Sequence, residues 1–205
     1  MKWGKWALAI AVVLAVKGVG GLPKAREMEQ LQLVDTLAVD GGERVTVTAV
    51  TAVRASEQEN SEVLRGEGKD LGSACQALQG ESARRAYLGQ TGQLLLGEDA
   101  DVAAALDFAA DERQLRLDTL LYIVRGQAGP GLEASAGLVA NETAGEDPRA
   151  KTVGEILPRL AEGERVLVPA LAPGEEGVLE PGGWAVLERW GLVGFLDDAV
   201  GTMSI

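Results

Sequence analysis

Carboxylates are the side chains of this 205-residue protein with the most capacity for chemistry. The sequence contains no histidine and a single cysteine, Cys75. Serine–histidine and cysteine–histidine nucleophile pairs, histidine-ligated zinc and an intrachain disulfide are therefore excluded. Carboxylates remain, because the chain holds 31 Asp and Glu residues against 19 Lys and Arg residues.

Three short clusters of acids are the candidates for acid–base or metal chemistry. Glu175-Glu176 and Asp197-Asp198 are adjacent pairs, and neighbouring residues point to opposite faces of a strand or are solvated in a loop. Glu98-Asp99-Ala100-Asp101 lacks the spacing of an EF-hand, so we interpret these acids as stabilising a helix N-terminus. A secreted enzyme would need two carboxylates brought together from distant positions, and this alternative stays open.

Two other features resemble functional motifs. Gly66-Glu67-Gly68-Lys69 is similar to part of a phosphate-binding loop, but Val63 and Asp70 occupy the positions that require Gly and Ser or Thr. We interpret it as a glycine-rich turn before a helix. Cys75 falls on an apolar helix face and is interpreted as a buried, inert thiol. No catalytic, cofactor-binding or metal-binding residue is predicted.

Composition narrows the classes of ligand. The net charge of −12 argues against nucleic acid, because phosphate binding requires clustered Lys and Arg. Aromatic residues are 4 % of the chain, too few for a platform that stacks single-stranded bases. Trp184 and Trp190 are interpreted as core residues, with an exposed contact patch as the alternative.

The N-terminal segment, residues 1–25, is interpreted as a signal peptide or a weak membrane anchor. Lys2 and Lys5 precede an uncharged apolar run, Trp6–Val16, which small residues follow. The run is shorter than the roughly 20 residues needed to span a bilayer. The segment holds four lysines and no acid, so the rest of the chain carries −16. Its own charge would not draw such a body to an anionic membrane, and a tether is expected.

Residues 26–205 are predicted to form one α+β domain, with a mixed or antiparallel sheet packed by helices. Residues 31–53 read as a β-hairpin whose second strand is half buried. Residues 54–68 read as an exposed loop, and the stripe of Leu71, Ala74, Cys75 and Leu78 predicts a helix capped by Gly80.

Alternating patterns place the remaining elements along the chain. Further strands are expected over 85–96 and 117–124, at an edge over 166–171 because of Pro169, and as a hairpin over 184–196. Helices are expected from about 98 to 110, over 133–139, and after a Thr152-x-x-Glu155 capping box.

Several segments, in matching order and spacing, resemble the N-terminal domain of the Ger(x)C family, the C subunit of bacterial spore germinant receptors. Arg26-Glu27-Met28-Glu29 resembles the family's Arg-Glu-Ile-Glu, and Leu37–Asp40 resembles its first strand, which ends in Gly-Ile-Asp. The segments that resemble later blocks are Gly66–Leu71 with Ala74 and Leu78, Gln93–Ala100, Leu106–Phe108 with Asp111, Arg116 and Leu117–Val124, Leu167–Leu171, Gly183–Leu187, and Leu192–Leu196.

The resemblance implies a non-enzymatic receptor subunit in nutrient-triggered germination. It would be exported and associated with the outer face of the inner spore membrane, and its partners would be the membrane-embedded A and B subunits. Family members begin with a lipobox that ends in a lipidated Cys, but Leu22 occupies that position here, so no lipid attachment site is expected. The family's larger C-terminal domain is not expected within residues 26–205. The alternatives are an exported module that binds a small ligand, and a truncated paralogue without receptor activity.

Overall fold

The computed structural model describes residues 31–51, 62–81, 84–111, 115–135 and 150–197. The N-terminal segment with Leu22, and Asp198 of the second acid pair, lie outside these ranges. Within the described residues, no helix is long and apolar enough to cross a bilayer.

A mixed β-sheet forms the centre of the domain. Its strands follow the order β10-β9-β8-β6-β5-β1-β2-β3, with β4 paired to β1 and β7 paired to β6. Neighbours among β1, β5, β6 and β8 run parallel, and the outer pairs are antiparallel. The strands are β1 (Leu31–Asp40), β2 (Val45–Thr51), β3 (Val63–Gly68), β4 (Arg85–Tyr87), β5 (Gln93–Gly97), β6 (Leu120–Val124), β7 (Lys151–Thr152), β8 (Val166–Pro173), β9 (Leu179–Glu188) and β10 (Gly191–Leu196).

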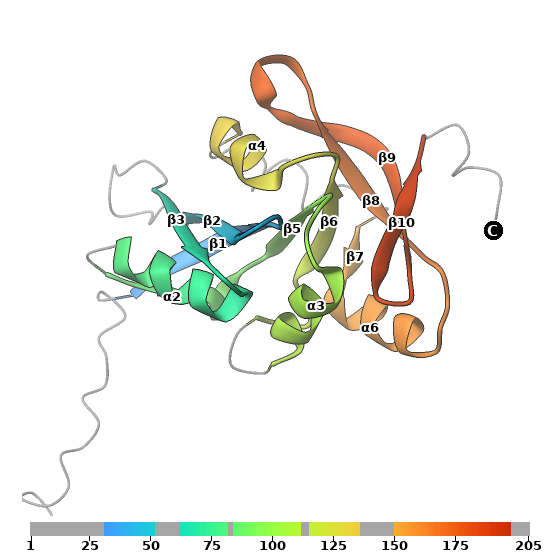
Figure 1. Ribbon diagram of the computed structural model, residues 1–205, viewed down its shortest axis with the longest axis horizontal. Coiled ribbons are helices and arrows are strands. Elements are labelled where there is room, and N and C mark those ends of the chain that lie inside the picture. Colours follow the sequence, from blue (N-terminus) through green and yellow to red (C-terminus); the bar gives the residue numbers. More distant parts are fainter. Residues whose placement is uncertain (1–30, 52–61, 82–83, 112–114, 136–149, 198–205) are drawn as a thin grey trace, which may run out of the picture. The chain divides into compact units, whose positions relative to one another are not determined.

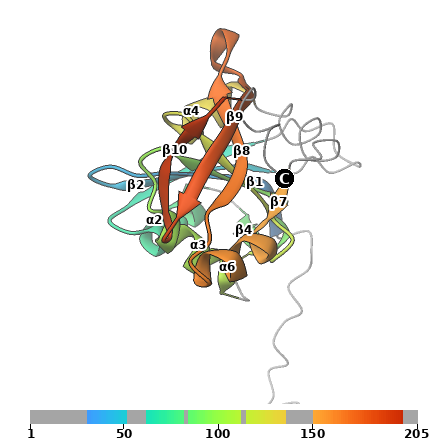
Figure 2. The same ribbon diagram turned by 90° about the vertical axis from the view of Figure 1, so that its right-hand side faces the viewer.

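Helices cover both faces of this sheet (Figures 1 and 2). Side chains of α2 (Leu71–Glu81), α3 (Val102–Ala110) and α6 (Val153–Ala161) share one buried cluster with alternate residues of the central strands. The opposite face packs against α4 (Ala128–Ala134). Two short 3₁₀ turns, η2 (Leu88–Gln90) and η3 (Glu175–Gly177), complete the described elements. The expected α+β class with a helix-packed sheet is confirmed.

The two predicted hairpins are present. β1 pairs antiparallel with β2, and β9 pairs antiparallel with β10. The expectation that β2 is half buried is wrong, because its residues from Val47 to Thr51 are buried. This strand lies between β1 and β3 inside the sheet, and the helices α2 and α4 both pack against it.

The exposed loop expected up to Gly68 is wrong for its last six residues, which form the edge strand β3. Its inward positions are Leu64, Gly66 and Gly68, so two of the three carry no side chain. A Cβ on Gly66 would lie 2.2 Å from the carbonyl oxygen of Ala74 in α2. The glycines of the phosphate-loop-like motif therefore allow α2 to pack closely against this strand.

Four boundaries also differ from the sequence analysis. The strand expected over 85–96 is divided by η2, and the next one begins at Leu120 because Leu117 lies outside the sheet, 56 % exposed. The helix expected over 133–139 is α4, which begins at Ala128, and α2 continues through Gly80 to Glu81. The expectation that Pro169 places its strand at an edge is wrong, because β8 lies between β9 and β6 inside the sheet. Pro169 is tolerated there because the pairing with β9 shifts register beside it.

Candidate functional site

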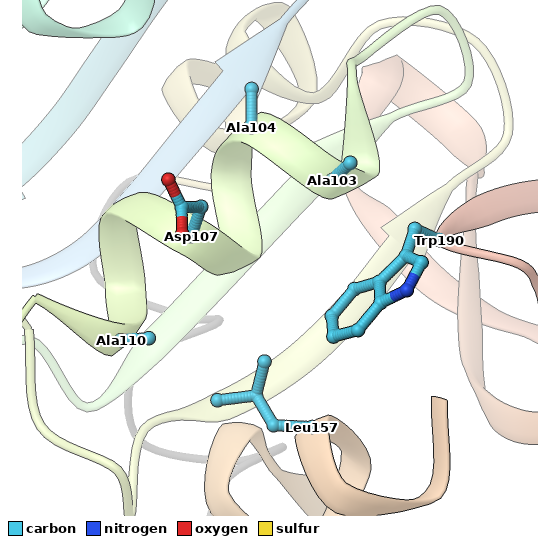
Figure 3. A pocket seen from close by; sticks show the side chains of 6 residues that line it. All are labelled: Ala103, Ala104, Asp107, Ala110, Leu157 and Trp190. Atoms are coloured by element: carbon cyan, nitrogen blue, oxygen red, sulfur yellow. The ribbon is translucent and has the colours of Figure 1, made fainter. Parts of the chain in front are cut away.

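An open apolar groove of about 490 Å³ lies between α3, α6 and the turn that joins β9 to β10 (Figure 3). The indole of Trp190 is directed into the gap between the two helices, with α3 on one side and Leu157 of α6 on the other. Asp107 contributes the one ionisable side chain of the lining. The lining residues are Ala103, Ala104, Asp107, Ala110, Leu157 and Trp190.

Local signals in the sequence set the orientation of α3. The Asp101 carboxylate caps the helix by accepting a hydrogen bond of 3.0 Å from the Ala104 amide. The buried stripe of α3, predicted correctly, is Val102, Ala105, Leu106 and Ala109. Burial of this stripe turns the other side of the helix toward the groove, where alanines leave room for a ligand.

The second wall is α6, which the predicted capping box begins. The Thr152 hydroxyl accepts a hydrogen bond from the Glu155 amide, and the Glu155 carboxylate accepts one of 2.9 Å from the Thr152 amide. The hydrogen bonds to Thr152 lower the pKa of Glu155. Burial of Val153, Ile156 and Leu160 against the sheet places Leu157 at the groove.

A two-residue turn carries the aromatic wall of the groove. Glu188 pairs with Gly191, so Arg189 and Trp190 are the loop residues, with φ of 51° and 65°. Trp190 is 37 % exposed, whereas Trp184 in β9 is half-buried. Interpreting both tryptophans as core residues is therefore wrong for Trp190, because its position in the turn keeps its indole at the surface.

The carboxylates that the sequence singled out are not assembled into one site. Glu98 accepts a hydrogen bond of 3.1 Å from the Gly126 amide, and Asp197 forms an ion pair of 3.1 Å with Arg125. Glu175 and Glu176 lie in η3. The described residues contain no group of three Cys, Asp or Glu side chains positioned to hold a metal ion.

Cys75 lies in the core, as its place on the helix stripe predicts. It is 5 % exposed, and burial raises the pKa of its thiol to about 12. Because the thiolate is the reactive form of cysteine, this side chain is poorly suited to nucleophilic chemistry.

Asp40 is a buried carboxylate whose role the sequence analysis missed. It lies at the end of β1 and accepts hydrogen bonds of 2.6 Å from the Ala128 amide and 2.8 Å from the Gly129 amide. These two amides belong to the first turn of α4, so Asp40 fixes that helix to the sheet. The sequence signal that could have revealed this role is a single acidic residue at the end of an apolar strand. A carboxylate buried there needs hydrogen-bond donors from another part of the chain.

The groove combines an aromatic face, a short apolar surface and a single carboxylate. This set of groups suits recognition of a cation carried on an apolar body. Acid–base catalysis on a glycoside would need a second facing carboxylate, which the described lining of the groove does not contain. Asp107 entered the sequence analysis only as part of a family-like segment, although an acid in the last turn of a helix is itself a signal.

Comparison with known proteins identifies the family. The profile of the spore germination protein N-terminal domain matches residues 24–136, more than half of the chain. No curated protein matches the sequence. A crystal structure of the GerBC protein aligns over 80 % of this chain and 52 % of its own, with 19 % identity and a TM-score of 0.43. This chain therefore spans about half the length of that GerBC chain. The family resemblance noted in the sequence is confirmed, and the protein belongs to the Ger(x)C family of spore germination proteins, of which it carries the N-terminal domain.

Proposed function

We propose that the protein is a non-enzymatic subunit of a spore germinant receptor and supports nutrient-triggered germination. The observation that carries this proposal is the family match over residues 24–136. The groove adds support, because its single carboxylate and apolar walls suit binding better than catalysis.

The subunit would act outside the inner spore membrane, in contact with the membrane-embedded A and B subunits. The part of the chain after residue 25 carries −16, so attraction to anionic lipid does not hold it there. The N-terminal segment and the receptor partners would supply the tether.

Co-purification tests this proposal directly. The full chain would be co-expressed with the A and B subunits, and the membranes would be solubilised in a mild detergent. We expect the A and B subunits to be retained with the tagged protein and to be absent from a mock purification with an unrelated exported protein. Purification of the tagged protein without either subunit would contradict the receptor role.

An exported small-ligand module is the second candidate, since a groove of about 490 Å³ is within the usual size of ligand sites. Such sites bury most of their ligand, whereas Ala104, Asp107, Ala110 and Trp190 are all exposed. Thermal shift against a panel of nutrients tests this function. A stabilising nutrient would favour it, and an unchanged melting temperature across the panel would exclude it for that panel.

A further inference from the structure

We infer that the groove between α3, α6 and the β9–β10 turn docks a protein segment that presents an Arg or Lys side chain among apolar side chains. The inference rests on the proposed receptor role, because it assigns this segment to one of the membrane-embedded subunits. The cationic group would lie against Asp107 and the indole of Trp190, and its apolar neighbours would cover the alanines and Leu157.

Asp107 occupies a position where the local structure favours the opposite charge. It lies in the last turn of α3, at the negative end of the helix dipole, and this turn contains no basic residue. Its carboxylate is exposed and makes no ion pair within the described residues. The negative charge of Asp107 is unfavourable at the C-terminus of α3. A cationic side chain of a binding partner would compensate for it.

Two arginines on the described elements that form the groove are paired with acids of the same chain. Arg159 of α6 forms an ion pair of 2.8 Å with Glu164. Arg189, next to Trp190, lies 3.9 Å from the carboxylate of Glu188. Asp107 is therefore the lining charge that remains for a partner, which makes the groove complementary to a cation.

Trp190 also departs from the preference of its local structure. Both residues of the turn have positive φ, a conformation that favours Asn-Gly in two-residue hairpins and disfavours bulky side chains. The sequence nevertheless places Trp here, with its indole at the mouth of the groove (Figure 3). Asp107 and Trp190 are far apart in the sequence, and each is unfavourable in its local structure, yet both line the same groove. Such locally unfavourable residues are typical of functional surfaces.

The same observations favour a protein segment over other occupants. Most of the lining is exposed, so a small molecule would remain largely in water. A second copy of this chain is disfavoured as the occupant, because two chains with a net charge of −12 repel each other. An anionic lipid surface is disfavoured because the carboxylate of Asp107 would repel it. A basic side chain on an extended apolar partner satisfies both the charge and the shape of the groove.

The test compares variants in the binding of solubilised A and B subunits by the full-length chain. Asp107→Lys should weaken binding at least about tenfold, because it replaces attraction with repulsion. Glu133→Lys makes the same change of charge on α4, which packs on the other face of the sheet, and should bind as the wild type does. Equal binding by wild type and Asp107→Lys would overturn the docking site but not the receptor role. If the wild type itself does not bind, the receptor role fails, and the docking site fails with it.

A stability measurement separates docking from a structural role. Asp107→Lys places a cation at the negative end of α3, so its melting temperature should rise by about 1–4 °C while its binding falls. A fall in melting temperature together with weaker binding would indicate a structural defect and overturn the inference.

Discussion

Asp40 shows how one buried side chain joins distant parts of the chain. Its carboxylate accepts two amide hydrogen bonds from α4, which lies 88 positions further along the sequence. The backbone must come close to this group, since a Cβ on Gly97 would lie 2.2 Å from the carboxylate and one on Gly129 would lie 2.9 Å from it. Asp40 therefore holds α4 against the sheet, and the two glycines leave the space that its carboxylate occupies.

Asp40→Asn should destabilise the domain. Asn can accept only one of the two hydrogen bonds, and its amide group would face a second buried donor, so we expect a loss of about 2–4 kcal/mol. For a domain of this size the melting temperature would fall by roughly 5–15 °C. Thermal unfolding followed by circular dichroism measures this change. A melting temperature equal to that of the wild type would show that the two hydrogen bonds contribute little.

Glu155 should make the stability of α6 depend on pH. Its hydrogen bonds to Thr152 lower its pKa in the folded state, so its carboxylate stabilises the fold above the unfolded pKa near 4.5. This contribution is lost as pH falls through the lower folded pKa. Glu155→Gln keeps a side-chain acceptor without the charge. We expect this variant to be less stable than the wild type at pH 7 and the difference to shrink by pH 3.

Chemical denaturation at both pH values measures the difference in the free energy of unfolding. The exposed Glu133→Gln on α4 serves as the control, because its side chain takes no part in the capping box. A difference that is the same at pH 7 and pH 3 would contradict the assigned role of Glu155.

At the level of elements, the sequence predicted those helices whose apolar stripe or capping residues lie within the helix itself. The stripe that begins at Leu71 and the Thr152 capping box lie within single elements, so their spacing was sufficient. Strand β3 and the start of α4 were missed because contacts from elsewhere define them. The glycines of β3 make room for α2, and Asp40 binds the first turn of α4.

Glycines at two positions of this region should respond oppositely to the same substitution. Gly66→Ala would place a Cβ against backbone atoms of α2, and we expect it to destabilise the domain by about 1–3 kcal/mol. Gly80→Ala is the matched control, since no atom lies within 4 Å of its Cβ position and the residue is helical. It should stabilise the domain by roughly 0.5–1 kcal/mol. Urea unfolding of both variants measures the two changes, and effects of the same sign would contradict the packing of β3 against α2.

The groove could not be predicted from the sequence for a similar reason. Its walls come from three segments that are distant along the chain, and nothing in the sequence around Trp190 shows which helices its indole will face. The sheet brings the β9–β10 turn to the same side as α3 and α6. Sequence reasoning therefore identified the family and the fold class, whereas the surface on which recognition depends required the three-dimensional arrangement.

For the whole molecule, the family match and the groove both support the proposed role, a receptor subunit that acts by binding. In that role its acidic body would depend on protein contacts and a tether to remain at a membrane, because its charge opposes anionic lipid. Docking through Asp107 and Trp190 would supply such a contact, and it should weaken as salt screens the exposed carboxylate.

Photocrosslinking from the groove tests the central claim most directly. A photoreactive phenylalanine analogue would replace Ala104, an exposed lining residue of α3, in the full chain expressed with the A and B subunits. The same substitution at the exposed Glu133 on α4 is the control. We predict a crosslink to the A or B subunit from position 104 and none from position 133. Association of the complex without a crosslink from position 104, or a crosslink only to a second copy of this chain, would contradict the claim.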